Sequence, residues 1–493
     1  MANITEQDAR LRRFERLVQA GVDPYPPYHE FDGLRLRHIV SNPPPEGQHI
    51  QTAGRVMRLR RHGGLVFVDL VQDNVRLQHA LRRDQVGEIF FNEFLDRTYV
   101  GDIIGCEGSI FHTRRGELTV DVESYQILSV CLRPIPGNRG FDGLSDVEQR
   151  YRNRHLDLLT NPRTQETLRF RSIIIHGLRS YLLGRGFVEV ETPILQSIYG
   201  GANAQPFVTR LNATEEDRFL RISPELYLKR LVVGGMERVF EIGRQFRNED
   251  IDVTHNPEFT SLEVYQAYCT YQTMMDLVEN LVVEVANQVA DGLEVEFQLG
   301  SGPTQRIDLS PPWRRVQFMD ALELNLEQSP TELTDGELGA LLNQHYGRGM
   351  ESLPRGVRLA KLFDAVVEPR LVQPTIVSDY PRETSPLCRP HRADPTLIER
   401  FELFIGGMEL ANAYSELNDP NLQFEAFRLA ELRNHVTQPY DWSYCESLAY
   451  GMPPTGGLGL GVDRLVMLLT SQPSIKEVIT FPLVREQSSL NTN

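Results

Sequence analysis

Apolar and polar positions follow two different patterns along the chain, and the change falls between residues 133 and 146. From about residue 51 to 133, short β-rich runs such as LVFVDLV (65–71) are separated by turns that contain glycine, and RRG (114–116) is typical of a hairpin turn. Four to six strands in about 85 residues predict a small barrel or sandwich.

Beyond residue 146, helical and extended patterns follow one another without regular alternation. MMDLVENLVVEVANQV (274–289) repeats apolar residues at the spacing of one helix face, and residues 165–184 also favour a helix. FVEVETPIL (187–195) is typical of a strand that runs into a proline. VFEIG (239–243) and FTSLEVYQA (259–267) predict an antiparallel pair joined by a polar loop. We therefore expect an α+β domain rather than a doubly wound parallel sheet.

Proline-rich segments suggest the division into domains. Residues 4–20 predict a helix, which the prolines of GVDPYPPY (21–28) end. Residues 133–146 are rich in Pro and Gly and have no periodicity, as domain linkers do. The expected parts are a helical extension over 1–48, a β domain over 49–134, a linker over 135–150 and an α+β domain over 151–493.

Composition and charge narrow the class of protein. Of 493 residues, 41% are hydrophobic, which is enough for a large core and excludes a mainly disordered chain. No apolar run approaches the roughly 18 residues of a membrane span. The first residues are charged from Asp8 onward and lack the apolar segment of a secretory signal. We expect a soluble cytoplasmic protein with no membrane partner.

The net charge of −16 argues weakly against nucleic-acid binding, but it is not evenly distributed. Residues 51–135 hold 11 Arg and 11 Asp or Glu, so this part is neutral. Arg55, Arg58, Arg60 and Arg61 cluster within it and could form a local basic face.

Several common chemistries lack their sequence patterns. The five cysteines include no CxxC pair, so we expect neither a structural zinc site nor a disulfide framework. Only three of the 51 basic residues are lysine, and none completes a GxxxxGK[ST] phosphate loop. The glycines at 456, 457, 459 and 461 do not fit GxGxxG. A bound nucleotide would therefore have its phosphates held by arginine and backbone.

Three polar clusters could carry chemistry, each with a structural alternative. FRNEDIDVTHNPEFT (246–260) joins arginine and carboxylates in a loop between strands, which favours a binding site over the alternative of a structural ion network. ELANAYSELNDP (409–420) places Glu409 and Glu416 seven apart, able to hold Mg²⁺ or simply to face solvent. GGLGLGVDRL (456–465) lets a ligand approach the backbone, with Arg464 at a helix start, or is a plain glycine-rich turn.

Together with GGANAQPF (200–207) and PELYLKRLVVGG (224–235), these segments resemble the class II aminoacyl-tRNA synthetases, specifically the lysyl-tRNA synthetases, from about residue 50 to 483. The family's motifs 1, 2 and 3 match at about residues 179–195, 240–268 and 456–470. The resemblance implies an OB-fold anticodon-binding domain followed by a class II catalytic domain built on an antiparallel sheet flanked by helices.

The resemblance also implies roles for individual residues. Arg247 and Arg464 match catalytic positions. The residues that match ATP-binding positions are Arg247, Glu249, His255, Asn256, Phe259, Glu409 and Arg464. Those that match lysine-binding positions are Gly201, Glu225, Arg247, Glu263, Tyr265, Asn412, Tyr414, Glu416 and Gly459. Glu409 and Glu416 match Mg²⁺ ligands, and Phe67 and Gln78 match anticodon-binding positions.

The implied activity is that of a lysine–tRNA ligase, which uses ATP and Mg²⁺ to form lysyl-adenylate and then charges tRNA(Lys). A homodimer through motif 1 is expected. One alternative is a paralogue that transfers lysine or an analogue to another acceptor, although such relatives typically lack the OB domain. The other is a non-catalytic tRNA-binding protein, which would be expected to lose Arg247, Glu409, Glu416 or Arg464.

Three departures from the family pattern are present. Ser124 stands where a glutamate often helps to read the anticodon, and Asp250 replaces a usual glycine in the motif 2 loop. The segment DWSYCESLAYG (441–451) lacks the acidic residues usual there.

Overall fold

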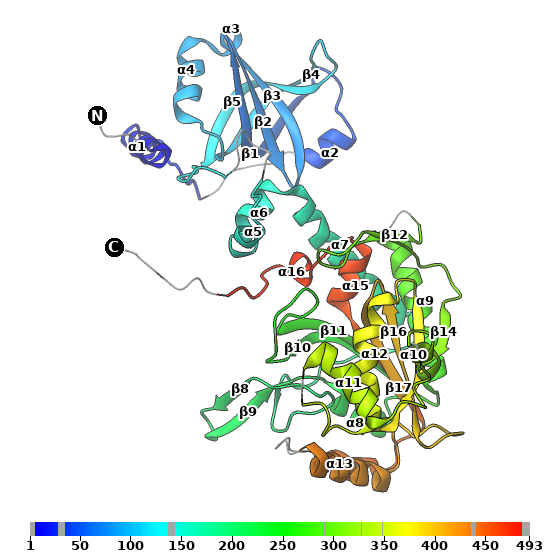
Figure 1. Cartoon of the computed structure of the whole chain (residues 1–493). Coiled ribbons are helices and arrows are strands. Elements are labelled where there is room, and N and C mark those ends of the chain that lie inside the picture. The colour runs from blue at the N-terminus through cyan, green and yellow to red at the C-terminus, as the bar shows by residue number, and fades with distance from the viewer. Residues whose placement is uncertain are drawn as a thin grey trace. The chain divides into compact units, whose positions relative to one another are not determined.

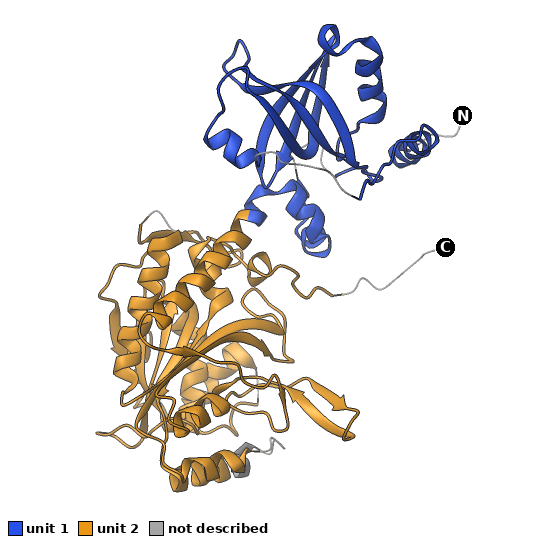
Figure 2. Cartoon of the chain, turned by 180° about the vertical axis from the view of Figure 1, so that it is seen from behind, with its two compact units in different colours: residues 1–165 blue, residues 166–493 orange. Residues whose placement is uncertain are grey.

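The computed structural model describes residues 5–27, 35–136, 143–289, 292–326, 328–347, 349–434 and 440–485. The chain forms two compact units, Met1–Gln165 and Glu166–Asn493 (Figure 2). Among the described residues, no helix combines the length and the apolar character needed to cross a membrane.

The first unit is built around a closed five-stranded barrel with the strand order β1-β2-β3-β5-β4 (Figure 1). Its strands are β1 (His49–His62), β2 (Leu65–Gln72), β3 (Val75–Arg82), β4 (Ile103–His112) and β5 (Leu118–Ser129). The β3–β5 pair is parallel and the other pairs are antiparallel. The RRG segment forms the turn between β4 and β5. The barrel predicted from the sequence is therefore confirmed.

Short helices surround the barrel. They are α1 (Glu6–Gln19), α2 (Leu36–Ser41), α3 (Arg83–Val86), α4 (Glu88–Arg97), α5 (Val147–Arg152) and α6 (Arg154–Thr160). Phe91 and Phe94 of α4 are buried in the same apolar cluster as the inward side chains of the strands, such as Val66 and Val68. Successive side chains of a strand point to opposite faces, so the residues between these inward positions lie on the outside of the barrel.

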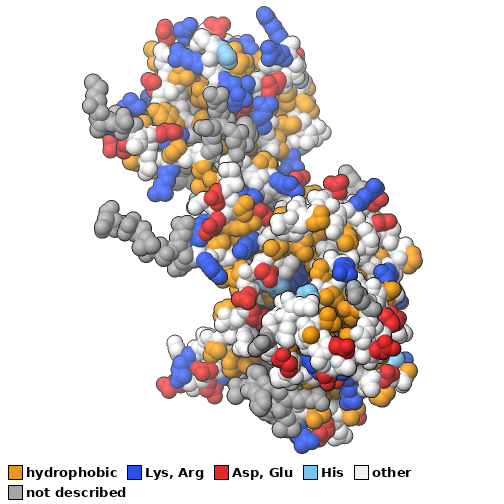
Figure 3. Space-filling model, viewed as in Figure 1, with side chains coloured by type: hydrophobic (Ala, Val, Ile, Leu, Met, Phe, Trp, Pro, Cys, Tyr) orange, Lys and Arg blue, Asp and Glu red, His pale blue; other side chains and the backbone are white. Residues whose placement is uncertain are grey.

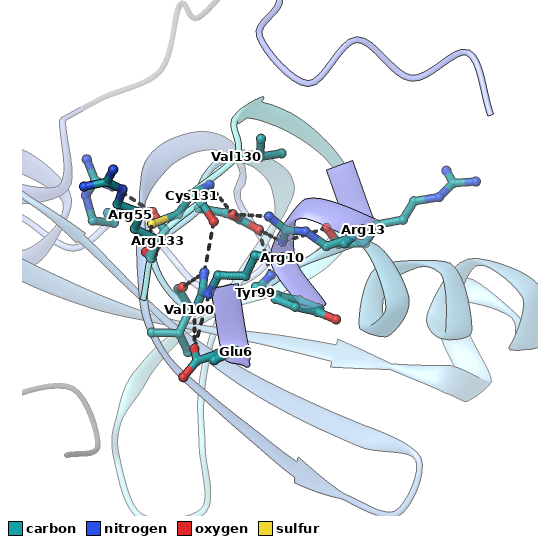
Figure 4. Close-up of polar contacts among 12 residues, drawn as sticks. Glu6, Arg10, Arg13, Arg55, Tyr99, Val100, Val130, Cys131 and Arg133 are labelled. Carbon is teal, nitrogen blue, oxygen red and sulfur yellow. Dashed lines mark hydrogen bonds and ion pairs between the residues drawn. The ribbon is translucent and has the colours of Figure 1, made fainter. Parts of the chain in front are cut away.

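Helix α1 is attached to the barrel through arginine side chains (Figure 4). Arg13 pairs with Asp102 at 2.5 Å, and both side chains are almost fully buried. Asp102 also accepts hydrogen bonds from the backbone N–H groups of Tyr99 and Cys131. Arg10 donates to the carbonyls of Val100 and Cys131. The mixed polar and apolar pattern of residues 4–20 follows from this buried polar contact.

The second unit contains an eight-stranded sheet with the order β14-β15-β16-β17-β18-β11-β10-β6. Its strands are β6 (Val188–Glu189), β10 (Arg238–Phe246), β11 (Glu258–Ala267), β14 (Arg314–Gln317), β15 (Thr375–Pro381), β16 (Leu397–Ile405), β17 (Met408–Ser415) and β18 (Thr455–Gly461). The six central strands are antiparallel, and the edge strands β6 and β14 pair in parallel. The expected α+β class with a central antiparallel sheet is confirmed.

One face of this sheet is covered by α7 (Pro162–Leu183), α9 (Tyr271–Val289) and α15 (Val462–Leu469), whose apolar side chains join those of β11, β16, β17 and β18 in the largest core (Figure 1). The predicted helix at 274–289 lies within α9, and most of that at 165–184 lies within α7. Gly177 of α7 lies against Val285 and Gln288 of α9, where a Cβ would approach the Gln288 side chain to 2.7 Å.

Helices also pack against the opposite face, at its two sides. Helix α8 (Glu225–Val233) packs over β10 and β11, while α10 (Phe318–Glu323), α11 (Asp335–Tyr346) and α12 (Arg355–Val366) pack beside β15 and β16. The remaining elements are β7 (Leu195–Gln196), β8 (Val208–Leu211), β9 (Glu216–Leu220), β12 (Glu294–Phe297), β13 (Gln305–Asp308), η1 (Glu368–Arg370), η2 (Arg382–Thr384), α13 (Pro420–Asn434), α14 (Trp442–Leu448) and α16 (Ile475–Val478). Polar side chains of the central strands occupy the stretch between the two groups of helices.

Candidate active site

The floor of the candidate site is made by three neighbouring strands. In the antiparallel register, Asn412 of β17 faces Gly459 of β18, which faces Glu263 of β11. A Cβ at Gly459 would meet only the Asn412 carbonyl oxygen, at 3.8 Å, so space lies above this glycine. Two residues away on β18, Gly457 lies between Tyr414 of β17 and Tyr265 of β11 in the same way. Five of the predicted lysine-binding residues therefore share one face of the sheet.

Carboxylates are concentrated at one end of this floor. Glu263 accepts hydrogen bonds from Ser223 Oγ and Tyr265 OH, each at 3.0 Å. Glu225 Oε1 accepts a 2.6 Å hydrogen bond from Tyr414 OH. Burial raises the pKa of Glu263 to about 7, and repulsion from Glu225 adds to this effect. This end of the floor is thus built to receive cations.

A buried ammonium group connects two of the carboxylates. Lys229, one helical turn after Glu225, lies 2.5 Å from Glu225 Oε1 and also pairs with Glu416 Oε2. Burial lowers the pKa of the Lys229 ammonium, but the two carboxylates outweigh this and hold it well above its ordinary value. Glu416 Oε1 is buried and receives no hydrogen bond from the described residues. Sequence reasoning gave Lys229 no role.

Glycine is required where the chain closes over the carboxylates. Gly201 has φ +85°, and a Cβ there would lie 2.9 Å from both Glu225 Cβ and Ser223 Oγ. The backbone of the 200–201 segment therefore lies directly on these side chains.

The other end of the floor holds basic and acidic side chains together. Helix α15 begins immediately after β18, which places Arg464 in its first turn as predicted. Arg464 donates to the Glu409 carbonyl at 2.6 Å and lies 3.0 Å from His255 Nε2. The Glu409 carboxylate is 3.7 Å from the Arg464 guanidinium. Three predicted ATP-binding residues are therefore adjacent.

Arg247 lies between these two ends. Its guanidinium carbon is 5.1 Å from the centre of the Phe259 ring, and its Nε donates to the Ile222 carbonyl at 3.4 Å. Burial lowers the pKa of the Arg247 guanidinium, while the carboxylates of Glu409 and Glu263 raise it. Arg247 therefore interacts with the carboxylates of both ends of the floor.

A buried ion pair braces the residues beside Phe259 and Arg464. Asp463 accepts hydrogen bonds from the backbone N–H of Thr260 at 2.7 Å and from Arg171 of α7 at 2.5 Å. Arg171 also donates to Thr260 Oγ1 at 3.0 Å. This contact fixes β11 to α15 directly beside two predicted ATP-binding residues, since Thr260 follows Phe259 and Asp463 precedes Arg464 in the sequence.

Two predicted ATP-binding residues have other contacts. Asn256 donates to the Glu258 carbonyl at 2.7 Å and accepts from the Leu483 N–H at 3.3 Å, so its amide supports the loop. Glu249 lies on the exposed part of the same loop and accepts from the Gln205 N–H at 3.3 Å.

Glu409 is the second residue of β17, and Glu416 directly follows its last residue, Ser415. Seven residues correspond to roughly 20 Å along a strand. One Mg²⁺ with its short oxygen bonds cannot span that distance, so the sequence-based pairing of these two residues in one metal site does not fit the structure. A β-bulge between β16 and β17 shifts the register next to Glu409.

Other carboxylates lie near Glu409. Glu368 Oε1 accepts a 3.1 Å hydrogen bond from the Glu409 N–H. Burial raises the pKa of Glu368 and of Glu402 to about 7 each, and the charge of Glu409 contributes to both shifts. Sequence reasoning missed both residues. Among the described residues, no group of three or more His, Cys, Asp or Glu side chains forms a metal site by itself.

Comparison with known proteins identifies the family. A family model described as tRNA synthetases class II (D, K and N) matches residues 146–485, and one described as OB-fold nucleic acid binding domain matches residues 50–128. The chain belongs to the class II tRNA synthetases.

Curated relatives are similar in sequence to this synthetase over nearly its full length. The lysine–tRNA ligase of Saccharolobus solfataricus is 44% identical over 97% of this chain and 97% of its own. Those of Fervidobacterium nodosum and Methanospirillum hungatei are each 42% identical over 98% of this chain and 95% and 96% of their own. The predicted membership of the lysyl-tRNA synthetase family is confirmed.

The two predicted anticodon residues of the synthetase lie on the side of the barrel wall away from its apolar core, Phe67 half-buried and Gln78 buried. Phe67 is half-buried between the inward-facing Val66 and Val68, so its ring is outside the barrel core. Arg60 lies 5.7 Å from that ring. Gln78, on the neighbouring strand, faces the same side and accepts from Thr119 Oγ1 at 3.1 Å. On the face shown in Figure 3, basic and acidic side chains are mixed in both units.

The three departures have defined surroundings in the synthetase. Ser124 donates to Glu107 at 3.0 Å, so a carboxylate stands beside the position where the family often has one. Asp250 is exposed on its loop. In the 441–451 segment, Asp441 caps α14 and pairs with Arg230 at 2.7 Å.

Proposed function

We propose that this synthetase is a lysine–tRNA ligase that activates L-lysine with ATP and transfers it to tRNA(Lys). The observation that supports this best is the cluster of Glu225, Glu263 and Glu416 at one end of the floor, where Glu416 Oε1 is buried beside Gly457 without a hydrogen bond from the described residues. Buried carboxylates demand cationic partners, and free lysine carries two ammonium groups. The name shared by the curated relatives is the same activity.

The proposed lysine site uses both ends of the carboxylate cluster. The substrate's α-ammonium group binds Glu225 and Glu263, with the backbone at Gly201 alongside. Its ε-ammonium group binds Glu416 and Tyr265. Selectivity follows because an uncharged side chain of the same shape would leave Glu416 Oε1 buried without a partner, at a cost of several kcal/mol.

The proposed nucleotide site is the other end of the floor. Arg464 and Phe259 hold the adenine, and His255 lies near the outer phosphates. Arg247 contacts the substrate carboxylate and the α-phosphate, which its position between the two ends supports. Lysine and ATP are thereby held as neighbours on one rigid sheet.

Activation needs no general base in this arrangement. A carboxylate oxygen of lysine attacks the α-phosphorus, a P–O bond forms, and the bond to the leaving pyrophosphate breaks. Arg247 and Arg464 neutralise the phosphate charge that would otherwise repel the attacking carboxylate. In the second step, the oxygen of the tRNA's 3′-terminal hydroxyl bonds to the activated carbonyl carbon, the bond from that carbon to the AMP oxygen breaks, and the hydroxyl proton leaves with the AMP phosphate.

The divalent metal of this reaction is Mg²⁺ in our proposal, held by Glu409 together with Glu402. Two carboxylates with ATP oxygens suit Mg²⁺, which usually takes one or two protein carboxylates and completes its shell with phosphates and water. The mutual repulsion of the two carboxylates supports a cation between them. When bound, the ion would offset phosphate charge and orient the pyrophosphate.

The barrel is proposed to bind the anticodon of tRNA(Lys). The half-buried ring of Phe67 offers a surface on which an unpaired base stacks, with Arg60 beside it. Gln78 faces the same side and is proposed to read a base edge. Charging tRNA for translation would place the protein in the cytoplasm.

A homodimer is proposed through the motif 1 region. This region and the neighbouring part of α7 expose large apolar side chains. Monomeric soluble proteins rarely expose large apolar patches, so these residues favour an interface. They are Ile173, Leu183, Val188, Ile194 and Leu195, each exposed by 42–51%. The short edge strand β6 lies among them and has an open side on which a second copy can pack.

The test is lysine-dependent exchange of pyrophosphate into ATP, run beside charging of total tRNA. We expect both activities, and we expect Arg247→Ala to abolish exchange while far-UV circular dichroism and thermal unfolding stay normal. Exchange without charging would support the paralogue that uses another acceptor. Absence of exchange in the wild-type protein would overturn the proposed function.

A further inference from the structure

Resting on the proposed function, we infer that Lys229 is a positioning residue for the substrate lysine. It holds one oxygen of Glu225 and one oxygen of Glu416, and so directs the other oxygen of each carboxylate toward a substrate ammonium group. No role for this residue follows from the sequence motifs, because the residues matched to the lysine site do not include it.

The contacts divide each carboxylate in two. Lys229 Nζ is 2.5 Å from Glu225 Oε1, which also accepts from Tyr414 OH. Its second contact is with Glu416 Oε2. None of the described residues donates a hydrogen bond to Glu225 Oε2 or to either oxygen of Glu416, so the contact between Lys229 and Glu416 is an ion pair that leaves Glu416 Oε1 free. The two free oxygens belong to the proposed α-ammonium and ε-ammonium sites, so one protein ammonium group orients both ends of the pocket.

The charges of the pocket support the same role. Glu225, Glu263 and Glu416 supply three carboxylates, and Lys229 supplies one fixed positive charge. Three buried carboxylates without this cation would repel one another, and protonation would relieve the repulsion. A protonated carboxyl is a poor acceptor for an ammonium group. Lys229 offsets part of this repulsion, and when the bound substrate keeps all three carboxylates ionised, the charge that remains matches the two ammonium groups of lysine.

The choice of lysine at this position is informative. Of 51 basic residues in the chain, only three are lysine, and Lys229 is fully buried. The rings of Tyr414 and Tyr444 lie 5.3 and 5.8 Å from its Nζ. A compact ammonium group can donate to two carboxylates in different directions inside such walls, whereas the larger planar fork of arginine favours bidentate contact with one.

The first test is the kinetics of Lys229→Met in lysine-dependent pyrophosphate exchange. We expect the KM for lysine to rise about 10- to 100-fold, because both carboxylates lose their fixed partner. The KM for ATP should stay within about two-fold, since Lys229 does not contact the nucleotide end. An unchanged KM for lysine would overturn the inference. A lower KM would show that Lys229 only opposes the substrate's charge, which also overturns it.

A second variant guards against a protein that does not fold. Lys229→Gln keeps a donor for one carboxylate without the charge, and its KM for lysine should lie between those of the wild type and Lys229→Met. Arg230→Met is the matched control: the neighbouring side chain pairs with Asp441 instead, so its kinetics should equal those of the wild type.

Chemical rescue separates positioning from general structural support. Lys229→Ala leaves space for a small alkylammonium ion, and propylammonium chloride should lower its KM for lysine toward the wild-type value. Potassium chloride at equal concentration should not. Equal effects of the two salts would contradict a defined ammonium site. Loss of exchange in the wild type would refute the proposed function instead, so the two failures are distinguishable.

Discussion

Replacement of Asp463 by Asn tests whether the buried brace controls the ATP end of the site. The wild-type carboxylate accepts one hydrogen bond from the Thr260 N–H and one from Arg171, at 2.7 and 2.5 Å. An amide has a single acceptor oxygen, so its NH₂ group must face either Thr260 N–H or the guanidinium. One of the two contacts is therefore replaced by two donors that face each other.

The size of the effect follows from the burial of this ion pair. The side chains of Arg171 and Asp463 are exposed by only 11% and 2%. Removing one partner of such a pair leaves the other charge uncompensated and costs about 3–5 kcal/mol. For a unit of this size, that lowers the midpoint of thermal unfolding by on the order of 10 °C. Because Thr260 follows Phe259 and Asp463 precedes Arg464, the loss also loosens the proposed adenine contacts.

Steady-state pyrophosphate exchange measures the consequence. The KM for ATP should rise about ten-fold, and the KM for lysine should change by less than about two-fold. Asp102→Asn is the matched control, because Asp102 likewise accepts from a buried arginine and from backbone N–H groups, but in the barrel unit. It should lower stability without changing the exchange kinetics. A parallel rise of both KM values in Asp463→Asn would refute the specific link to ATP.

Three further predictions concern the barrel and the lysine pocket. Phe67→Ala should reduce tRNA charging about 10- to 100-fold but leave exchange unchanged, since a lost base stack costs about 1–3 kcal/mol; equal loss in both assays would contradict an anticodon role. Gly459→Ala should fold normally and raise the KM for lysine, because its Cβ enters open space. Gly457→Ala should lower thermal stability, because its Cβ collides with Glu416 and Tyr265. A loss of stability in Gly459→Ala with none in Gly457→Ala would contradict the assigned floor. Burial raises the pKa of Glu263 from 4.5 to about 7, so its contribution to stability falls as pH rises between these values. Lysine binding near pH 6.5 should therefore release a proton, measurable by calorimetry in buffers of different ionisation enthalpy. Binding without proton release would contradict the assignment of Glu263 to the ammonium group.

Local sequence patterns predicted the regular elements well because their causes are local. The apolar spacing of residues 274–289 is a property of one helix face, and it forms the buried face of α9. The pair 239–243 and 259–267 alternates around a polar loop, and it forms β10 and β11. The polar clusters could also be found, because Arg247 and Arg464 stand next to apolar strands and helices that fix their places.

Contacts between distant segments could not be predicted in the same way. Lys229 and Glu225 are four apart on a helix, a pattern usually found on solvated surfaces. Its contact with Glu416 depends on how α8 packs over the sheet, which no local pattern encodes. The pairing of Glu409 with Glu416 failed for the same reason: both residues were read by sequence spacing, while their strand separates them along its full length.

In the proposed reaction, the strands of the sheet carry most of the side chains that contact lysine, and the helices carry groups that orient those side chains. The side chains proposed to touch lysine are mainly on β11, β17 and β18, whose antiparallel register sets their spacing. The groups that orient them come from helices on opposite faces: Lys229 of α8 acts on the lysine end, and Arg171 of α7 acts on the ATP end. Since Lys229 and Arg171 contact residues at different ends of the floor, their substitution should alter the KM of different substrates. Combining Lys229→Met with Asp463→Asn should then give additive changes in transition-state free energy, because the two contacts share no residue.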